Sequence, residues 1–548
     1  TLNQITNKSY SHTTSERHMV DGKFITSEEF ASGINKYFVS VGGQPLPVSV
    51  TSPSNNNATP LQQLSVGEVK LLIKKLDTTK STNSSDYPTW VSKDCSEDIC
   101  IPLQDILNSM LQSGVYPNKW KMSQITPLPK CNNPSEYKHY RPISLLFHLG
   151  KLAEQVIVDK MRFTIDKVIS PSQFAYRPNL STTDALLKYI DDLTEQLDDP
   201  GTKFIQSAFL DFSKAFDRLQ PALVIEKMIS YGFHTKIVSL VSSFLSGRKQ
   251  CVKFSNCFSD YILTHVGSPQ GTKLGPLLWL IYVNDLQAED YHCIKYADDT
   301  TFYRRSTDHF STNLIGDAVS ATNTWSFKNS MILNSSKTVI LNTSLSSRHS
   351  HVSDVVLEDV VLSPATETKF LGVIVDDKIS FSEHSDFLVS KCNSRLFLMR
   401  KLKTLGLNNA GLKTFFESNI RSILIYGAPA WFTIMCKQSK DKLESIQRHA
   451  TRVIFPHLAY DERLTELRMQ TLHDFIFSIC VNHFKRIEGD PSHPLFKCIS
   501  FNHCKRSSRS RNTGTTHFRP AICRTKKRSN SFFQFFMTFF NNQRIYIE

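Results

Sequence analysis

The chain has 548 residues, of which 40% are hydrophobic, and carries a net charge of +14 at pH 7. This length is more than one domain usually holds, and the hydrophobic fraction excludes a disordered chain. No stretch approaches the roughly 20 apolar residues of a membrane span, and no secretion signal is visible, so we expect no membrane partner. The positive balance indicates a polyanionic partner.

The positive charge is concentrated near the C-terminus. Residues 491–547 contain eleven Lys and Arg and no Asp or Glu, which leaves +3 for the rest of the chain. Such a charge block is typical of a disordered arm that binds RNA, and this is our expectation here. The His and Cys residues of the tail match no standard zinc-knuckle spacing: His493, Cys498, His503 and Cys504.

The first 98 residues are expected to form an extension with linkers. Apolar residues at Phe30, Ile34 and Phe38 follow a weak helical pattern, and residues 51–60 have the polar, Pro-containing composition of a linker. Ser65 and Glu68 form a capping box, which predicts a helix start.

From Ile99 onward the sequence has the pattern of a packed domain. Two basic residues stand in successive stretches of this domain, Lys130 at the end of 120–130 and Arg141 in 140–146. Arginine offers a planar fork to phosphate oxygens and lysine a point charge, so both residues are candidate phosphate contacts.

Three aspartates stand at the ends of predicted strands. Asp211 ends the run 204–210, and Asp298 and Asp299 lie at the tip of a predicted hairpin formed by residues 293–303. An isolated Asp-Asp pair is usually a surface turn. A third carboxylate on a neighbouring strand changes that interpretation, because such a set can hold two Mg²⁺ ions.

Further segments surround these aspartates in the sequence. Residues 267–276 contain three Gly and two Pro and lead into an apolar helix, which indicates a backbone that another molecule approaches closely. After residue 384 three apolar helical stripes follow, and their polar faces are basic. We expect these faces to contact a nucleic-acid backbone.

Taken in this order, the segments resemble the reverse transcriptases of non-LTR (LINE-type) retrotransposons, and most closely the jockey-like group. The resemblance runs from about Ile99 to about Phe455. It implies an α+β right-hand polymerase fold with fingers, an antiparallel palm sheet, a helical thumb and a basic C-terminal tail. The implied divisions are 1–98 (extension), 99–383 (fingers and palm), 384–455 (thumb) and 456–548 (C-terminal region).

The resemblance also implies the chemistry of the site. It assigns Asp211, Asp298 and Asp299 to two Mg²⁺ ions, for which Mn²⁺ can substitute, with the backbone carbonyl of Phe212 assisting. Lys337 corresponds to a lysine near the leaving pyrophosphate, where it can donate a proton.

Substrate contacts follow from the same motifs. Phe216, next to Ala215, corresponds to the bulky residue that excludes a ribose 2′-hydroxyl, and Gln270 and Gly271 lie beside the incoming nucleotide and template. Tyr296 is a further substrate contact.

Two more groups complete the implied site. Arg141 and Lys130 correspond to contacts of the triphosphate. Phe370, Leu371 and Gly372 correspond to the primer grip. Lys273 departs from the small or apolar residue that is usual at its position.

The implied activity is RNA-directed DNA synthesis with an RNA template, a DNA primer or target DNA, and dNTPs. We expect a nuclear and cytoplasmic ribonucleoprotein. Residues 1–98 are too few for the endonuclease of such elements, and the start at Thr1 suggests a truncated product. Alternatives are a catalytically decayed or domesticated nucleic-acid-binding remnant, a telomerase or group II intron polymerase, and a generic basic RNA-binding protein.

Overall fold

We analysed a computed structural model of the chain, which describes residues 18–47, 61–308, 310–311, 314–346, 351–352, 354–502 and 517–545. The chain forms two compact units that alternate along the sequence. Unit 1 comprises residues 1–170, 212–286 and 325–332, and unit 2 comprises residues 171–211, 287–324 and 333–548. The linker predicted at 51–60 lies outside the described residues.

Unit 1 contains a five-stranded sheet in the order β4-β3-β6-β7, with β8 also paired to β6. Strands β3 and β4 form an antiparallel hairpin, whereas β3 and β6 run parallel. The N-terminal helix α2 packs on β6, and the buried side chain of Phe30 joins it to the sheet. The strands of this sheet are β3 (Met122–Pro129), β4 (Tyr140–Leu145), β6 (Arg248–Phe254), β7 (Cys257–Phe258) and β8 (Ile262–Thr264). A separate two-stranded sheet is formed by β1 (His18–Val20) and β2 (Lys23–Ile25).

Helices make up the rest of unit 1. The predicted capping box of Ser65 and Glu68 is confirmed at the start of α3. Wholly within this unit lie α2 (Ser27–Ser40), α3 (Val66–Lys74), α4 (Thr89–Asp94), α5 (Ser96–Ser113), α6 (His148–Val168), α8 (Ala215–Arg218), α9 (Pro221–Ser230), α10 (Thr235–Leu245) and α11 (Leu274–Val283). Short 3₁₀ turns are η1 (Asn118–Lys121) and η2 (Tyr137–His139).

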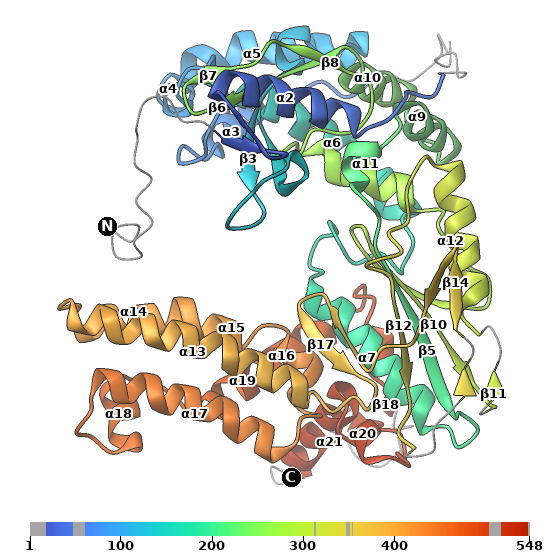
Figure 1. Cartoon of the computed structure of the whole chain (residues 1–548), viewed down its shortest axis with the longest axis vertical. Helices are drawn as coiled ribbons and strands as arrows, with labels where there is room; N and C mark the ends of the chain where they lie inside the picture. Colours follow the sequence, from blue (N-terminus) through green and yellow to red (C-terminus); the bar gives the residue numbers. More distant parts are fainter. Residues whose placement is uncertain are drawn as a thin grey trace, which may run out of the picture. The chain divides into compact units, whose positions relative to one another are not determined.

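Unit 2 is built on a four-stranded antiparallel sheet in the order β12-β5-β10-β9 (Figure 1). Its strands are β5 (Phe204–Leu210), β9 (His292–Tyr296), β10 (Asp299–Ser306) and β12 (Val339–Thr343). All seven residues of β5 are buried, because β5 is a central strand with α7 (Thr182–Asp198) packed against it. The antiparallel palm sheet expected from the resemblance is therefore present.

Short paired strands extend this unit. They are β11 (Phe310–Ser311) with β13 (His351–Val352), β14 (Val355–Leu357) with β15 (Val360–Leu362), and β16 (Glu367–Phe370) with β17 (Val373–Asp376). Helix α12 (Gly316–Lys328) begins in unit 2 and ends in unit 1.

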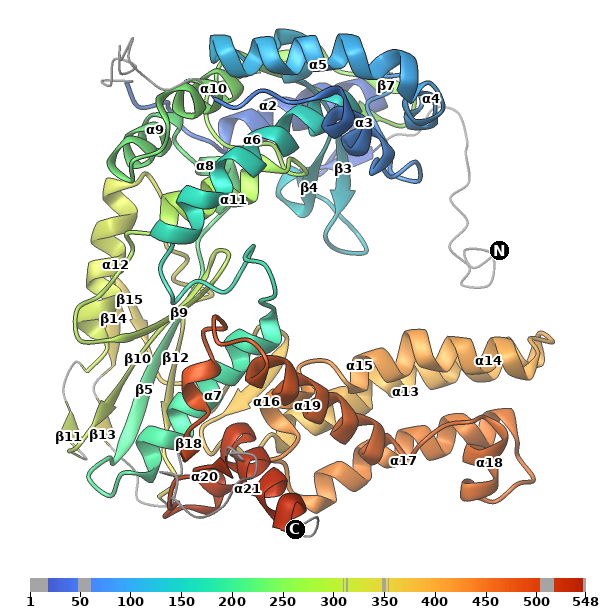
Figure 2. The same ribbon diagram turned by 180° about the vertical axis from the view of Figure 1, so that it is seen from behind.

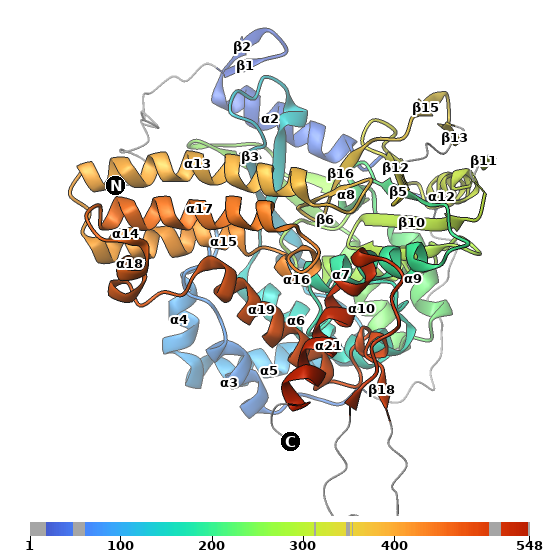
Figure 3. The same cartoon turned by 90° about the horizontal axis from the view of Figure 1, so that it is seen from below.

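Two long helices follow β17 and pack alongside each other, as Figure 3 shows. These are α13 (Ser382–Thr404) and α17 (Lys437–Ile454). The predicted apolar stripe of α13 is confirmed, since Leu388, Cys392, Leu396 and Met399 are all buried. Between them lie α14 (Asn409–Phe416), the π-helical turn η3 (Glu417–Arg421), α15 (Ser422–Leu424) and α16 (Ala428–Trp431).

The C-terminal region folds onto unit 2, and the expectation of a disordered arm is wrong for its described part. It contains α18 (Tyr460–Glu466), α19 (Leu472–Glu488), η4 (Phe496–Cys498), β18 (Phe501–Asn502), β19 (His517–Phe518), α20 (Lys526–Ser529) and α21 (Phe532–Ile545). Helices α20 and α21 contact α7 (Figure 2). The aromatic residues of α21 supply the apolar surface that this packing requires. His503 and Cys504 lie outside the described residues.

No helix in the described part of the chain is both long and apolar enough to cross a lipid bilayer.

Candidate active site

The three predicted acidic residues lie at one end of the palm sheet. Leu210 pairs with Thr300 across β5 and β10, so Asp211 and Asp299 are the next residues on either side. Tyr296 pairs with Asp299, which leaves Ala297 and Asp298 as a two-residue turn. Ala297 has a positive φ of 58°, a strained value for a residue with a Cβ, and its N–H donates to Gln173 Oε1 at 3.3 Å. The hairpin predicted from the sequence is confirmed.

Asp211 and Asp299 line one pocket of about 340 Å³ in unit 2. Lys337, Phe370 and Leu371 line it as well, whereas Asp298 does not. Lys337 Nζ lies 3.3 Å from Asp211 Oδ2. Among the described residues, no three His, Cys, Asp or Glu side chains come together as ligands of one ion.

The carboxylates at this end of the sheet repel one another. The pKa of Asp299 is raised to about 6, first by lost hydration and then by the negative charges of Asp298 and Asp211. Lost hydration and Asp211 also raise the pKa of Asp298. Lys337 opposes both shifts without cancelling them. Bound cations would offset this excess of negative charge, and carboxylate oxygens are the ligands that Mg²⁺ prefers. The donor chemistry of Asp211 and Asp299, which line one pocket, therefore suits Mg²⁺.

The residues expected to form the primer grip lie on a tight turn of unit 2. Phe370 pairs with Val373, so Leu371 and Gly372 form the two-residue loop between β16 and β17. Both have positive φ, 45° and 89°, as hairpin turns of this length require. Tyr426 OH donates to the Leu371 carbonyl at 2.9 Å, and a Cβ on Gly372 would lie 2.9 Å from the Tyr426 ring. This close approach explains why a residue without a Cβ occupies position 372.

In unit 1 the Gly- and Pro-rich loop is held against the β3–β4 hairpin. The N–H of Ser144 donates to the Gln270 carbonyl at 2.9 Å. Gly271 follows with a φ of 109°, and a Cβ there would lie 3.0 Å from the Ser144 carbonyl oxygen. The backbone conformation and the limited space therefore both favour glycine at this position.

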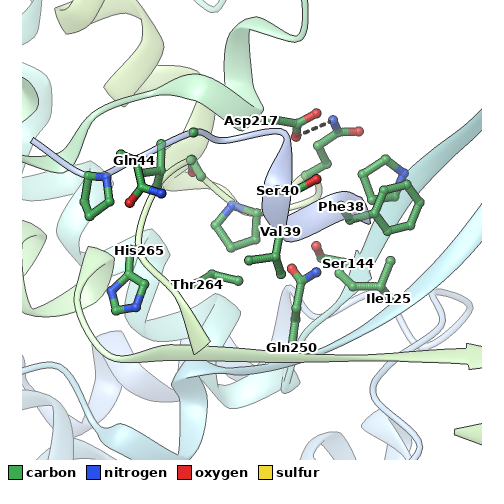
Figure 4. Close-up of a pocket in the computed structure, with 18 residues that line it drawn as sticks. Phe38, Val39, Ser40, Gln44, Ile125, Ser144, Asp217, Gln250, Thr264 and His265 are labelled. Carbon is green, nitrogen blue, oxygen red and sulfur yellow. Dashed lines mark hydrogen bonds between the residues drawn. The ribbon is translucent and has the colours of Figure 1, made fainter. Parts of the chain in front are cut away.

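Gln270 lines a second pocket, of about 370 Å³, within unit 1 (Figure 4). Its side-chain amide donates to Asp217 Oδ1 at 3.1 Å, which is the dashed line in the figure. Burial raises the pKa of Asp217, and this hydrogen bond opposes the rise. Residues 38–40 of the N-terminal extension form part of the wall, which was not foreseen from the sequence.

Glu154 is a further residue of this loop that was not foreseen. Its fully buried carboxylate accepts the backbone N–H groups of Lys273 at 2.6 Å and Leu274 at 3.2 Å. A carboxylate at a helix N-terminus satisfies donors that have no partner within the helix, here those of α11. Lys273, the departure noted in the sequence, also donates through Nζ to Gln155 Oε1. The sequence signal for this role of Glu154 is a single acidic residue on the apolar face of α6.

The remaining predicted contacts of unit 1 lie elsewhere on it. Lys130 and Arg141 are both exposed at the loop end of the β3–β4 hairpin, where Leu128 pairs with Arg141. Neither lines the Gln270 pocket. Phe216 lies in α8 with its ring centroid 5.5 Å from that of Trp279. Ala215 and Phe212 are buried.

Comparison with known proteins identifies the central segment. Residues 128–375 match the family described as reverse transcriptase (RNA-dependent DNA polymerase). These residues belong to that family. The reverse transcriptase domain therefore includes the palm sheet, all three aspartates and the loop of Gln270.

Relatives that align with about three quarters of the chain come from mobile elements. One is the "Probable RNA-directed DNA polymerase from transposon BS" of Drosophila melanogaster, 25% identical over 76% of this chain and 47% of its own length. Another is the "RNA-directed DNA polymerase from mobile element jockey" of the same species, 25% identical over 79% of this chain and 49% of its own length. The chain thus spans about half the length of these relatives. The predicted resemblance to jockey-like reverse transcriptases is confirmed.

Among solved structures, apo telomerase from Candida tropicalis aligns with a TM-score of 0.35 and 13% identity, covering 72% of each chain.

Proposed function

We propose that this chain is an RNA-directed DNA polymerase that adds dNTPs to the 3′-hydroxyl of a DNA primer on an RNA template. The observation that carries the proposal is the meeting of Asp211 and Asp299 at one pocket of a reverse transcriptase domain. As in a non-LTR element, the template would be element RNA, and the work would take place in a nuclear and cytoplasmic ribonucleoprotein.

Asp211, Asp298 and Asp299 would hold two Mg²⁺ ions, with Phe212 contributing its backbone carbonyl. When bound, the ions would offset charge on the phosphates and on the attacking and leaving oxygens. Lys337, with its amine 3.3 Å from Asp211 Oδ2, would donate a proton to the departing pyrophosphate. Positioning dominates the rate of phosphoryl transfer, so the rigidity of the β5–β10 pair matters.

Other residues would bind the substrates. Gln270, Gly271 and Tyr296 would contact the nucleotide and template, and Leu371 the primer. The exposed cations of α13 and α17 would contact the primer–template backbone, because a row of Lys and Arg on adjacent helices neutralises phosphates: Lys391, Arg395, Arg400, Lys401, Arg448 and Arg452.

Primer extension tests the proposal. The purified chain, a DNA primer annealed to an RNA template, dNTPs and Mg²⁺ should give full-length DNA, and chelation of Mg²⁺ with EDTA should stop synthesis. RNA binding without any extension, across several primer–template pairs and with Mn²⁺ as well, would favour the alternative of a decayed nucleic-acid-binding remnant.

Phe216 provides a test of sugar selection. We expect Phe216→Val to raise the use of ribonucleotides relative to deoxyribonucleotides by about tenfold, because removing ring atoms leaves room for a 2′-hydroxyl. Incorporation rates of matched dNTP and rNTP pairs measure the ratio. Phe258→Val, at an exposed site of the same unit, is the control. An unchanged ratio in Phe216→Val would remove Phe216 from this role.

A further inference from the structure

Helix α7 carries a row of acidic side chains, and two of them are buried. Asp184 is fully buried and Asp191 is 4% exposed. Spacings of seven, four and three residues put the row on one face of the helix: Asp184, Asp191, Glu195 and Asp198. Buried carboxylates require charged or hydrogen-bonding partners, because desolvation of an unpaired charge is very unfavourable. The partners of this row lie some 300 residues later in the chain.

The first turn of α7 is bound by α19. Arg486 Nη2 lies 2.7 Å from Asp184 Oδ1, and its Nη1 donates to the Asn179 carbonyl at 3.3 Å. His483 Nε2 and His493 Nε2 lie 3.1 and 3.5 Å from the same carboxylate oxygen. Burial disfavours the Asp184 carboxylate, yet His483, His493 and the Ser181 side chain keep its pKa well below its usual value. The other oxygen, Oδ2, accepts the N–H of Ser181 in the capping box.

The middle of α7 is bound by α20. Arg528 Nη1 lies 2.6 Å from Asp191 Oδ1 and donates to the Asp191 carbonyl at 3.1 Å. The side chains of Arg528 and Asp191 are 7% and 5% exposed, so water screens this pair weakly. Burial raises the pKa of Asp191 to about 6, and the guanidinium opposes that rise.

The last turn of α7 is bound by the segment before α20. Arg524 Nη2 donates to the Leu197 carbonyl at 2.9 Å, and Arg524 Nε to the Asp198 carbonyl at 2.7 Å. The N–H of Thr525 donates to Asp198 Oδ1 at 2.6 Å. Carbonyls at a helix C-terminus lack partners within the helix and carry partial negative charge, so an arginine there is favourable.

Helix α7 in turn contacts the strands that carry the candidate catalytic groups. Tyr189 OH donates to Ser207 Oγ of β5 at 2.9 Å, and its ring packs on Phe209 and Phe370. Tyr303 of β10 donates a hydrogen bond to Asp192. Phe209 and Phe370 line the same pocket as Asp211 and Asp299. Side-chain contacts therefore run from the C-terminal arginines through α7 to that pocket.

We propose that Arg486, Arg524 and Arg528 are positioning residues for nucleotide incorporation, which hold α7 and through it the strands β5 and β10 in register. This inference rests on the proposed function. It gives Arg524 and Arg528, two cations of the basic tail, a role within the protein in place of the RNA contacts that their charge alone suggests.

The test compares Arg528→Gln with Lys526→Gln in the full chain. Both changes remove one positive charge from α20, but Lys526 is exposed. Active-site titration followed by single-turnover incorporation, at saturating primer–template and dNTP, separates the rate per active site from the active fraction. We expect Arg528→Gln to lower the rate per site at least about tenfold, with RNA affinity within about twofold of the unchanged chain. Lys526→Gln should change neither quantity.

Asp191→Asn is an independent test of the inference, because it removes the same ion pair by changing the residue on α7. It should lower the rate per site as Arg528→Gln does, and the double variant should be no worse than either single change, since the two act through one contact. Arg528→Lys should recover part of the rate by restoring the charge.

Three results would overturn the inference. One is weaker RNA binding by Arg528→Gln at an unchanged rate, which would mark an RNA contact. Another is a smaller active fraction with a normal rate per site, which would mark a purely structural role. The third is the same rate per site and the same RNA affinity in Arg528→Gln and Lys526→Gln. If the chain without any substitution shows no activity, that result contradicts the proposed function and not this inference. Amide hydrogen exchange at Leu210 and Thr300 would then test the inference by itself, because exchange should be faster in Arg528→Gln than in Lys526→Gln.

Discussion

Asp211→Asn is expected to lower the rate of nucleotide incorporation by at least about 10³-fold, which corresponds to about 4 kcal/mol of lost transition-state stabilisation. Asparagine has nearly the size of aspartate but no charge, so β5 and its pairing should persist. The change removes one of the two carboxylates that line the pocket and leaves Lys337 without its anionic partner. Metal binding by the remaining aspartates should weaken accordingly.

Single-turnover incorporation at saturating dNTP measures this effect, together with a circular-dichroism spectrum that checks folding. Asp359→Asn, at an exposed position of the same unit, is the matched control and should keep full activity. Activity above one tenth of the unchanged chain in a folded Asp211→Asn variant would exclude Asp211 from the catalytic set. That result would remove the central observation behind the polymerase proposal.

The palm could be predicted from the sequence because its signals are local. The run 204–210 contains two phenylalanines and an isoleucine and is bounded by Lys203 and Asp211, and the structure gives the same bounds for β5. The hairpin at Asp298 follows from two flanking strands and a two-residue turn. Only the register between β5 and β10, which brings Asp211 next to Asp299, needed the tertiary fold or the family resemblance.

The C-terminal region could not be predicted in the same way. Its partners on α7 are 302 to 337 residues away in sequence, as for Arg486 with Asp184 and Arg528 with Asp191. A run of Lys and Arg without acidic neighbours looks like a solvated arm when its partners are that distant. The local signal is the aromatic run of residues 532–540, which is too short for a membrane span and forms most of α21 in the structure.

Phe536→Ala is expected to lower the free energy of unfolding of unit 2 by about 3–5 kcal/mol, the usual effect of removing a buried phenylalanine. Phe536 is fully buried in α21, and its ring centroid lies 5.6 Å from that of Phe477 and 5.8 Å from that of Phe484, both in α19. The cavity left by the ring would lie between α21 and α19, and the surrounding aromatic rings can close it only in part.

Pulse proteolysis across a urea series, with detection of fragments from unit 2, measures this change. Ile522→Ala is the control, because Ile522 is fully exposed and its loss should cost under about 0.5 kcal/mol. A disordered basic arm predicts equal, negligible effects for both variants. A folded C-terminal region predicts a large effect for Phe536 alone, since only that side chain is removed from a packed core. Such a difference would establish that the most basic segment of the chain is part of the folded body of unit 2, which the positioning role of Arg524 and Arg528 requires.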